Sequence, residues 1–332
     1  MEEYKTILEA INANLQKTDA SRTEFVLNTV CTIFLYDQAS DDVYNAVFDD
    51  IREIESRMSA YLPNSDIARI NASAGIAPVE VHDDVFEVLE RAVRFAQISG
   101  GAFDPTVGPL TALWGISGDN PRVPSLKEID AVLPLVNWQD IELDREHKSV
   151  FLRQMGMALD LGAIAKGYAA DRAVAIIKEA QLKRALIDLG GNVITYGVKK
   201  DKTPWKIGLQ DPREKRGSYI GIISGWDQTV VTSGVYERFF IEDGVRYHHL
   251  FSPADGFPAR TGLLSVSIIT DVSMDADALS TAVFVLGYEK GKALLESLDN
   301  VEAVFVFENG SIRKTVGAAF ELTSDAYRLL ID

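Results

Sequence analysis

Apolar residues recur along this chain with two different periods, and the period changes many times between its ends. Spacings of three and four predict amphipathic helices around 43–58 and 85–96, and further helices over about 164–180 and 277–297. Short runs of branched and aromatic residues predict strands in TVCTIFLY, RALIDL, PWKIGL, YIGIIS, TVVTSG, LLSVSIIT and VEAVFVF. The alternation of the two patterns predicts a mixed α/β (α+β) fold rather than a repeat array.

Turn residues divide these segments. FFIEDGVRYHHLF (239–251) and VFVFENGSIRK (304–314) each place Gly beside Asp or Asn between two strand-like runs, which predicts two hairpins. GISGDNPRVPS (115–125) is rich in Gly, Pro and Ser, so we expect a surface loop there, at which two lobes would divide.

The composition is that of a soluble globular protein. With 332 residues, 47% of them hydrophobic, the chain can bury a full core in one large domain or two small ones. No apolar run approaches the roughly 20 residues of a membrane span. The first 25 residues are polar and contain no signal-peptide core.

The charge balance narrows the choice of partner. Acidic residues outnumber basic ones by 49 to 33, for a net charge of −16, so we expect no nucleic-acid partner. An anionic ligand would need a metal ion, backbone N–H groups or a few placed cations. The single cysteine, Cys31, excludes a disulfide within the chain and a cysteine-ligated zinc site, and its apolar surroundings predict core packing.

Four stretches carry residues suited to chemistry. The first, ISGGAFDPTVGPL (98–110), surrounds Phe103, Asp104 and Thr106 with Gly and Pro, so its backbone can approach a ligand while Asp104 offers a carboxylate. Loops of this composition are also ordinary turns, and the stretch alone does not decide between the two.

The second stretch, DLGAIAKGYAAD (160–171), ends a strand-like run and continues at helical period. We expect Gly162 and Ala163 at the helix N-terminus, where free N–H groups and the helix dipole attract anions, with Lys166 one turn further on. In the alternative, Asp160 is a cap and Lys166 is solvated.

The third stretch, VSMDADALSTAVFVLG (272–287), places Asp277 and Thr281 four residues apart on one helical face, with Asp275 as the expected N-cap. A carboxylate, a hydroxyl and a backbone carbonyl suffice for Mg²⁺, which completes its shell with water and phosphate. Such a pair is also common by chance.

The fourth stretch, RYHHLFSPADGFPARTG (246–262), contains His248 and His249. Adjacent side chains of a strand point to opposite faces, so one of the two can face a site. Histidine is the usual general base near neutral pH, although a purely structural role is equally common.

The order of the motifs is more specific than any one of them. RMSAYLPNSDIARIN, GGAFDPTVGPL, DLGAIAKGYAAD, LIDLGGN, HHLFSPADGFPA and MDADALSTAVFVLG closely resemble the ApbE-type FAD:protein FMN transferases over roughly residues 21 to 325. The resemblance implies a two-lobed fold with mixed sheets and flanking helices, with 1–20 as an N-terminal extension and 21–332 as the transferase domain. It also implies binding of FAD and Mg²⁺, cleavage of the diphosphate, transfer of FMN to a threonine or serine of a flavoprotein, and release of AMP.

The resemblance assigns roles to particular residues. The Ala163 carbonyl, Asp277 and Thr281 would hold Mg²⁺. The attacking hydroxyl must lose its proton, and we expect His249, rather than His248, to be the base, which makes His249 and Asp277 the expected catalytic residues. FAD would be bound by Leu27, Tyr61, Ala102, Phe103, Asp104, Asp160, Lys166 and Leu250, with Tyr61 packed on the flavin. The family's pattern DP-x-TG reads SPADG (252–256) here, so the first Asp of that pattern is missing.

Two other functions fit the same residues. One is a Mg²⁺-dependent FAD pyrophosphatase, in which water replaces the protein hydroxyl. The other is a non-catalytic flavin-binding protein, which would be expected to lack the metal ligands.

The family's acceptor pattern, Asp-x-x-Ser/Thr-Gly-Ala-Thr, does not occur in this chain, so the acceptor flavoprotein is expected to be another protein. Family members are commonly lipid-anchored on the outer face of the cytoplasmic membrane, whereas this N-terminus, if native, predicts a cytoplasmic protein.

Overall fold

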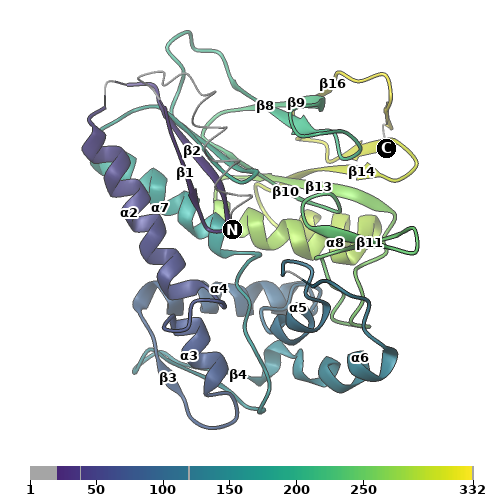
Figure 1. Cartoon of the computed structure of the whole chain (residues 1–332). Helices are drawn as coiled ribbons and strands as arrows, with labels where there is room; N and C mark the ends of the chain where they lie inside the picture. Colours follow the sequence, from purple (N-terminus) through teal and green to yellow (C-terminus); the bar gives the residue numbers. More distant parts are fainter. Residues whose placement is uncertain (1–20, 38, 119, 331–332) are drawn as a thin grey trace.

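A nine-stranded sheet forms the centre of the chain in a computed structural model that describes residues 21–37, 39–118 and 120–330 (Figure 1). The predicted extension, 1–20, lies outside the described residues. Across the sheet the strands follow the order β1 (Ser21–Val26), β2 (Thr29–Leu35), β6 (Ala185–Leu189), β7 (Asn192–Tyr196), β10 (Thr229–Gly234), β13 (Leu263–Thr270), β14 (Glu302–Phe307), β15 (Ser311–Lys314) and β17 (Arg328–Leu329). All neighbours are antiparallel except β15 and β17.

The helices expected from apolar periodicity are all present. They are α2 (Asp41–Met58), α4 (Asp83–Ile98), α7 (Ala165–Glu179) and α8 (Ser273–Glu296). Helix α8 packs on β10 and β13, and α7 contacts both α2 and α8. The buried faces of these elements merge into one apolar core, which contains Cys31 as expected.

Helix α8 begins at Ser273, earlier than its apolar period indicates, and Asp275 is not its N-cap. The carboxylate of Asp171, on α7, accepts the N–H groups of Ser273 and Met274, both at 2.9 Å, and so caps α8 from outside. Asp275 instead forms a two-bond ion pair with Arg91 of α4. The prediction of Asp275 as the cap was wrong because the cap comes from another helix.

A smaller sheet lies on the opposite face of the central sheet from α8. It consists of β16 (Phe320–Leu322), β9 (Tyr219–Gly225) and β8 (Trp205–Gln210), and its apolar residues pack against Val230, Ile269 and Val304 of the central strands. Both predicted hairpins are present, one as β14–β15 and the other as β11 (Phe239–Glu242) with β12 (Val245–His248). These elements, with the seven predicted strands, confirm a mixed α/β fold.

The lower part of the molecule in Figure 1 contains short elements that the apolar pattern does not predict. They are α3 (Asp66–Ala72), β3 (Val79–Glu80), α5 (Gly108–Trp114), α6 (Leu126–Val132), the 3₁₀ turns η1 (Leu133–Leu135) and η2 (Trp138–Asp140), β4 (Ile141–Asp144) and β5 (Ser149–Leu152). Elements of this length show too few turns or alternations for a clear period.

The loop 115–125 does not divide two lobes, contrary to expectation. It joins α5 to α6, and both helices contribute to one apolar cluster around Trp114. Gly115 ends α5 in the left-handed conformation, with φ of 61°, and Ser125 with Glu128 forms a capping box that starts α6. Its Gly and Ser residues are therefore helix stop and start signals rather than a linker.

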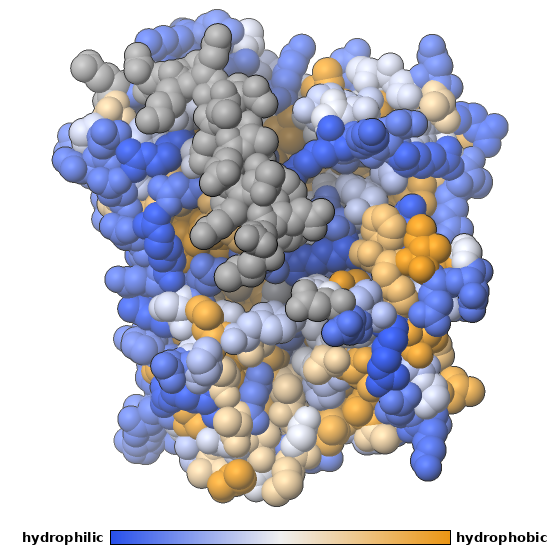
Figure 2. Space-filling model, in the orientation of Figure 1, coloured by the Kyte–Doolittle hydropathy of each residue, from blue (hydrophilic) through white to orange (hydrophobic). Residues whose placement is uncertain are grey.

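On the visible face, hydrophilic residues predominate in the upper part, whereas apolar residues gather at the level of β11 and over the lower part (Figure 2). Exposed apolar residues of that hairpin are Phe239, Ile241 and Val245. Among the described residues, no helix has the length and apolar character needed to cross a membrane.

Candidate active site

A tight turn precedes helix α7 and positions the residues of the DLGAIAKG stretch. One oxygen of Asp160 accepts the N–H of Gly162 at 2.8 Å, and Nζ of Lys166 donates to the Gly162 carbonyl at 2.8 Å. The helix begins at Ala165, so Gly162 and Ala163 lie directly before its N-cap residue, Ile164. Asp160 therefore stabilises this turn but does not cap α7, whose N-cap residue is Ile164 and has no side-chain cap hydrogen bond.

Helices α7 and α8 bring two of the sequence motifs into contact. Oδ2 of Asp277 accepts the N–H of Gly167 at 3.0 Å, and its Oδ1 lies 3.5 Å from Nζ of Lys166. The approach requires glycine, because a Cβ at position 167 would stand 2.3 Å from the carbonyl oxygen of Ser273. Lys166 is thus paired with Asp277 rather than left to the solvent.

The residues predicted to bind a metal offer oxygen atoms only. Asp277 is 4% exposed, and Thr281 follows one helical turn later with its Oγ1 3.3 Å from Oγ of Ser233. The third predicted ligand is the carbonyl of Ala163, in the turn before α7. No group of three or more His, Cys, Asp and Glu gathers as a metal site among the described residues. A donor set with one carboxylate fits Mg²⁺, which keeps water and phosphate ligands, better than Zn²⁺ or Ca²⁺.

The two histidines at the end of β12 differ in environment, as strand alternation predicts. His248 is buried, its Nε2 lies 3.1 Å from the Ala259 carbonyl, and its ring meets Phe284 edge-on. Burial lowers its pKa to about 4. These contacts give His248 a structural role.

His249 is only partly buried and pairs with the carbonyl of Arg238. That oxygen lies 3.1 Å from the backbone nitrogen of His249 and 3.2 Å from its Nδ1. Since a carbonyl only accepts, Nδ1 carries the proton, which leaves Nε2 with a free lone pair. Burial, followed by the positive charge of Arg238, lowers the pKa of His249 to about 3. The ring is therefore neutral and able to accept a proton.

Tyr61 presents an aromatic ring near Asp160 and Arg238. It lies in the loop between α2 and α3, and the residue is 71% exposed, so it is not part of the core. Restricted hydration of its hydroxyl raises its pKa; the charge of Asp160 adds to this effect and that of Arg238 opposes it. The loop, the turn before α7 and the start of β11 therefore converge on one region.

Other predicted ligand-binding residues are engaged within the protein. Oδ1 of Asp104 accepts the N–H and the hydroxyl of Thr106 at 2.8 and 2.6 Å, and its Oδ2 accepts the N–H of Trp138 at 3.0 Å. The carboxylate thus holds its own loop to η2, and burial raises its pKa. Phe103 and Leu250 are core residues, only 3% and 5% exposed.

Ala102 and Leu27 retain partly exposed surface. Leu27 stands in the β1–β2 turn with φ of 55°, and the Glu55 carboxylate accepts N–H groups of this turn. The structure thus brings Tyr61, Asp160, Lys166, Asp277 and His249 into one region. For the apolar residues, packing against a ligand stays a prediction.

Sequence reasoning missed Glu237 and Arg238, which precede β11. Burial raises the pKa of Glu237, and the charges of Arg216, Lys166 and Arg238 lower it, so these cations lie around it. A signal for Arg238 was present in the sequence. A two-residue turn at Asp243-Gly244 sets residue 238 opposite residue 249 in the hairpin register.

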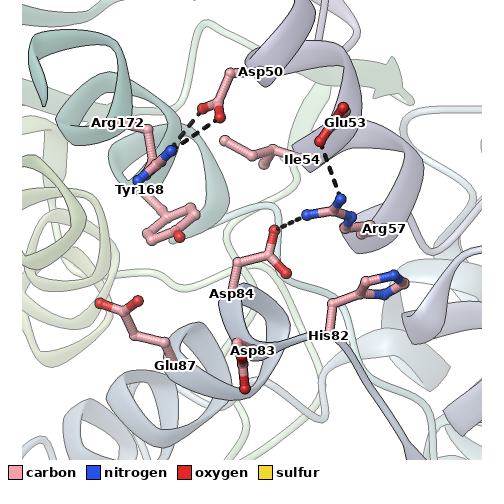
Figure 3. A pocket seen from close by; sticks show the side chains of 10 residues that line it. All are labelled: Asp50, Glu53, Ile54, Arg57, His82, Asp83, Asp84, Glu87, Tyr168 and Arg172. Atoms are coloured by element: carbon pink, nitrogen blue, oxygen red, sulfur yellow. Dashed lines mark hydrogen bonds and ion pairs between the residues drawn. The ribbon is translucent and has the colours of Figure 1, made fainter. Parts of the chain in front are cut away.

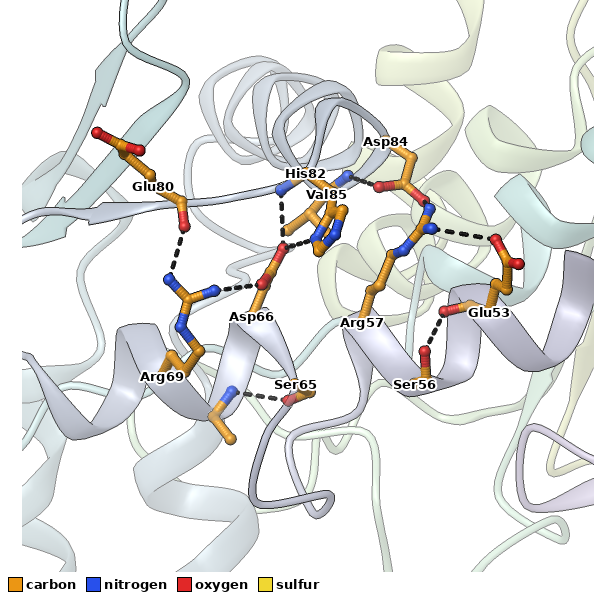
Figure 4. Close-up of polar contacts among 11 residues, drawn as sticks. Glu53, Ser56, Arg57, Ser65, Asp66, Arg69, Glu80, His82, Asp84 and Val85 are labelled. Atoms are coloured by element: carbon orange, nitrogen blue, oxygen red, sulfur yellow. Dashed lines mark hydrogen bonds and ion pairs between the residues drawn. The ribbon is translucent and has the colours of Figure 1, made fainter.

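A cavity of about 380 Å³ lies elsewhere, between α2, α4 and α7 (Figure 3). Its wall includes the ion pairs of Arg57 with Asp84 at 2.8 Å and of Arg172 with Asp50 at 3.1 Å. Figure 4 shows these contacts of Arg57 with Asp84 and Glu53 and, as a separate group, those of Asp66 with Arg69 and His82. None of the predicted site residues lines this cavity, and its ion pairs connect helices α2, α4 and α7.

Comparison with known proteins finds close similarity over most of the chain. The ApbE family model matches residues 27–305. The FAD:protein FMN transferase of Treponema pallidum is 41% identical over 314 residues, which cover 90% of this chain and 87% of that protein. One from Klebsiella pneumoniae is 40% identical over 280 residues, covering 84% and 86%. The crystal structure of the ApbE protein from Thermotoga maritima superposes with a TM-score of 0.80 at 35% identity, covering 92% of this chain and 96% of that one.

Proposed function

This chain belongs to the ApbE family, and on that basis we propose that it is an FAD:protein FMN transferase acting with Mg²⁺. One observation carries the proposal: Asp277, Lys166 and His249, from three distant parts of the sequence, surround one region beside an exposed tyrosine ring. The retained pair Asp277 and Thr281 argues against a flavin-binding protein without catalysis.

The metal would be held by Asp277, Thr281 and the carbonyl of Ala163. Bound there, Mg²⁺ would neutralise diphosphate charge and make phosphorus more electrophilic. Lys166 keeps the Asp277 carboxylate in place through the 3.5 Å ion pair, and the Gly167 N–H fixes its other oxygen. The chain therefore orients its one buried carboxylate at this site before any ligand arrives.

FAD would be held on both sides of this carboxylate. Tyr61 provides a planar face for the flavin, and Asp160 and Lys166 lie at the turn before α7. Ala102, Phe103, Asp104, Leu27 and Leu250 would complete the walls. Because the Asp104 carboxylate already accepts three hydrogen bonds, we assign it to shaping its loop rather than to a direct contact.

His249 would remove the proton from the attacking hydroxyl. Its Nδ1–H is held by the Arg238 carbonyl, so Nε2 is the acceptor atom, and the lowered pKa keeps the ring neutral. AMP leaves as a phosphate monoester and needs little acid assistance. Water in place of the hydroxyl would give FMN and AMP, the pyrophosphatase outcome.

The test measures AMP release and acceptor mass together, with FAD and Mg²⁺, with and without a protein that carries Asp-x-x-Ser/Thr-Gly-Ala-Thr. Slow AMP release that accelerates when the acceptor is added, with one FMN gained per acceptor, is expected. An acceptor whose Ser/Thr is replaced by Ala is the matched negative control. Fast release of AMP and free FMN with an unmodified acceptor would establish the pyrophosphatase instead.

The same assay tests His249. His249→Ala should slow transfer by about 10²- to 10⁴-fold while FAD still binds, as expected for a lost general base. His147→Ala is the control, because His147 is an exposed histidine outside the proposed site and its ring pairs with Asp144. Equal rates for the two variants would remove His249 from the mechanism.

A further inference from the structure

We propose that Arg238 is a further catalytic residue, whose guanidinium binds the phosphoryl group while it moves from FAD to the acceptor hydroxyl. This inference rests on the proposed transfer. It concerns a residue that precedes β11 and lies outside the motifs that carried the family resemblance.

The hairpin register places Arg238 beside His249. Phe239 pairs with His248 in β11–β12, so Arg238 and His249 are the next opposing positions, and the 3.1 Å hydrogen bond from the His249 N–H to the Arg238 carbonyl continues the pairing. Directly opposed residues of an antiparallel pair point to the same face, with Cβ atoms roughly 4.5–5.5 Å apart. An acceptor hydroxyl that donates its proton to His249 therefore lies within reach of the Arg238 side chain.

The guanidinium of Arg238 has no partner of its own in the described part of the chain, where neither an ion pair nor a side-chain hydrogen bond engages it. Other arginines near the helices are paired, such as Arg91 with Asp275 and Arg172 with Asp50. Lys166, the other cation at the site, is already bonded to Asp277 and Gly162. In a chain of net charge −16, an unpaired arginine beside the base is available for an anion.

Electrostatic effects agree with this placement. After burial, the charge of Arg238 is the next cause that lowers the pKa of His249, and it also opposes the rise of the Tyr61 pKa. The positive charge is thus close enough to act on both the proposed base and the proposed flavin platform. The phosphate nearest the flavin is the one that becomes part of the product.

The chemistry of the step explains why an arginine is useful there. The bond from the FMN phosphorus to the bridging diphosphate oxygen breaks, and its electron pair leaves with AMP. A bond forms between that phosphorus and the acceptor oxygen, whose proton goes to Nε2 of His249. Negative charge on the transferred oxygens is held by the guanidinium, which offers parallel donors to phosphate and does not change its own protonation.

The experiment compares Arg238→Ala, Arg238→Lys and Arg238→Gln with the wild type, with Arg246→Ala as the matched control. Arg246 belongs to the same hairpin and stacks over the Phe239 ring at 4.4 Å. We expect Arg238→Ala and Arg238→Gln to lower kcat for acceptor labelling by about 10²- to 10³-fold, the loss typical of one preorganised donor to a developing charge. Arg238→Lys should recover part of this loss, Arg246→Ala should match the wild type, and FAD affinity should change far less than kcat.

Thermal unfolding accompanies each assay, and the backbone carbonyl that pairs with His249 remains in every variant. A kcat near wild type in Arg238→Ala, with an active wild type, would overturn the role of Arg238 and leave the proposed function intact. A rate that returns to the wild-type value at alkaline pH would also overturn it, because Arg238 would then act only by lowering the pKa of His249. A wild type that yields neither AMP nor labelled acceptor would overturn the proposed function itself.

Discussion

The Asp277 side chain accepts a hydrogen bond from the Gly167 N–H and also carries a negative charge. Two substitutions separate these contributions. Asp277→Asn keeps an acceptor for the Gly167 N–H but loses the charge, so it should retain stability and abolish Mg²⁺-dependent transfer. Asp277→Ala should also lose about 1–3 kcal/mol of unfolding free energy, because it leaves the buried N–H unsatisfied. Denaturant unfolding and the transfer assay check both. Full activity of Asp277→Asn would remove the metal from this position.

Tyr61 is an exposed ring whose replacement should cost binding rather than folding. Aromatic stacking contributes about 0.5–1.5 kcal/mol beyond area burial, so Tyr61→Ala should raise the Kd for FAD by roughly 2- to 10-fold. Tyr61→Phe should bind as the wild type does, and Tyr219→Ala, at another exposed tyrosine, is the control. Quenching of flavin fluorescence measures the affinity, and an unchanged Kd for Tyr61→Ala would exclude stacking.

The environment of His249 determines how the reaction responds to pH. An ordinary histidine has a pKa near 6.5, and a folded-state pKa lowered to about 3 means that the ring stays neutral as the pH falls through 6.5. The transfer rate should therefore show no acid limb from His249 between about pH 5 and 8. The pH profile of kcat/KM checks this. An acid limb centred near 6.5 would mean that the base is a solvated histidine or another group.

At the level of elements, the crossing of α7 and α8 at Gly167 brings Lys166 and Asp277 together. A Cβ at this position would overlap the carbonyl of Ser273, so Gly167→Ala should push the helices apart, lower the unfolding free energy by about 1–3 kcal/mol and reduce transfer. Gly118→Ala, whose added Cβ would have its nearest neighbour at 3.4 Å, is the control. Equal stability of the two variants would show that α7 and α8 can adjust without cost.

The β11–β12 hairpin contributes to the site by its register. Its two-residue turn, Asp243-Gly244, sets His248 and His249 on opposite faces, so one ring packs on Phe284 and the other remains available. The apolar residues Phe239, Ile241 and Val245 of the same hairpin are exposed.

At the scale of the whole molecule, the net charge of −16 opposes the binding of a dinucleotide diphosphate. After chelation of divalent metal, FAD should bind weakly, and its affinity should rise as salt is increased from about 0.01 to 0.15 M, since the screening length falls from roughly 30 to 8 Å. With Mg²⁺ restored, affinity should be higher and less dependent on salt. Titration with and without chelator checks both. Unaltered affinity after chelation would argue that Lys166 and Arg238 alone hold the diphosphate.

The amino-acid sequence by itself determined the elements and their local geometry. Apolar periodicity located α2, α4, α7 and α8, and branched runs located β2, β6, β8, β9, β10, β13 and β14, because these patterns depend on neighbours a few residues away. The strands β1 and β7 of the central sheet were not predicted. The same local rules placed Asp277 and Thr281 on one helical face and made a hairpin of 239–251. Short elements such as α3 and α5 were missed because they contain too few residues for a period.

Only the tertiary structure decided how these elements meet. It paired Lys166 with Asp277 and made Asp171, instead of Asp275, the cap of α8. It also directed the Asp104 carboxylate toward hydrogen bonds that hold its own loop in place. The same packing left the Arg238 guanidinium without a partner among the described residues and left Tyr61 exposed. Partners, burial and pKa of a side chain depend on atoms brought close by packing from distant parts of the chain, and packing is a property of the whole fold rather than of any local pattern.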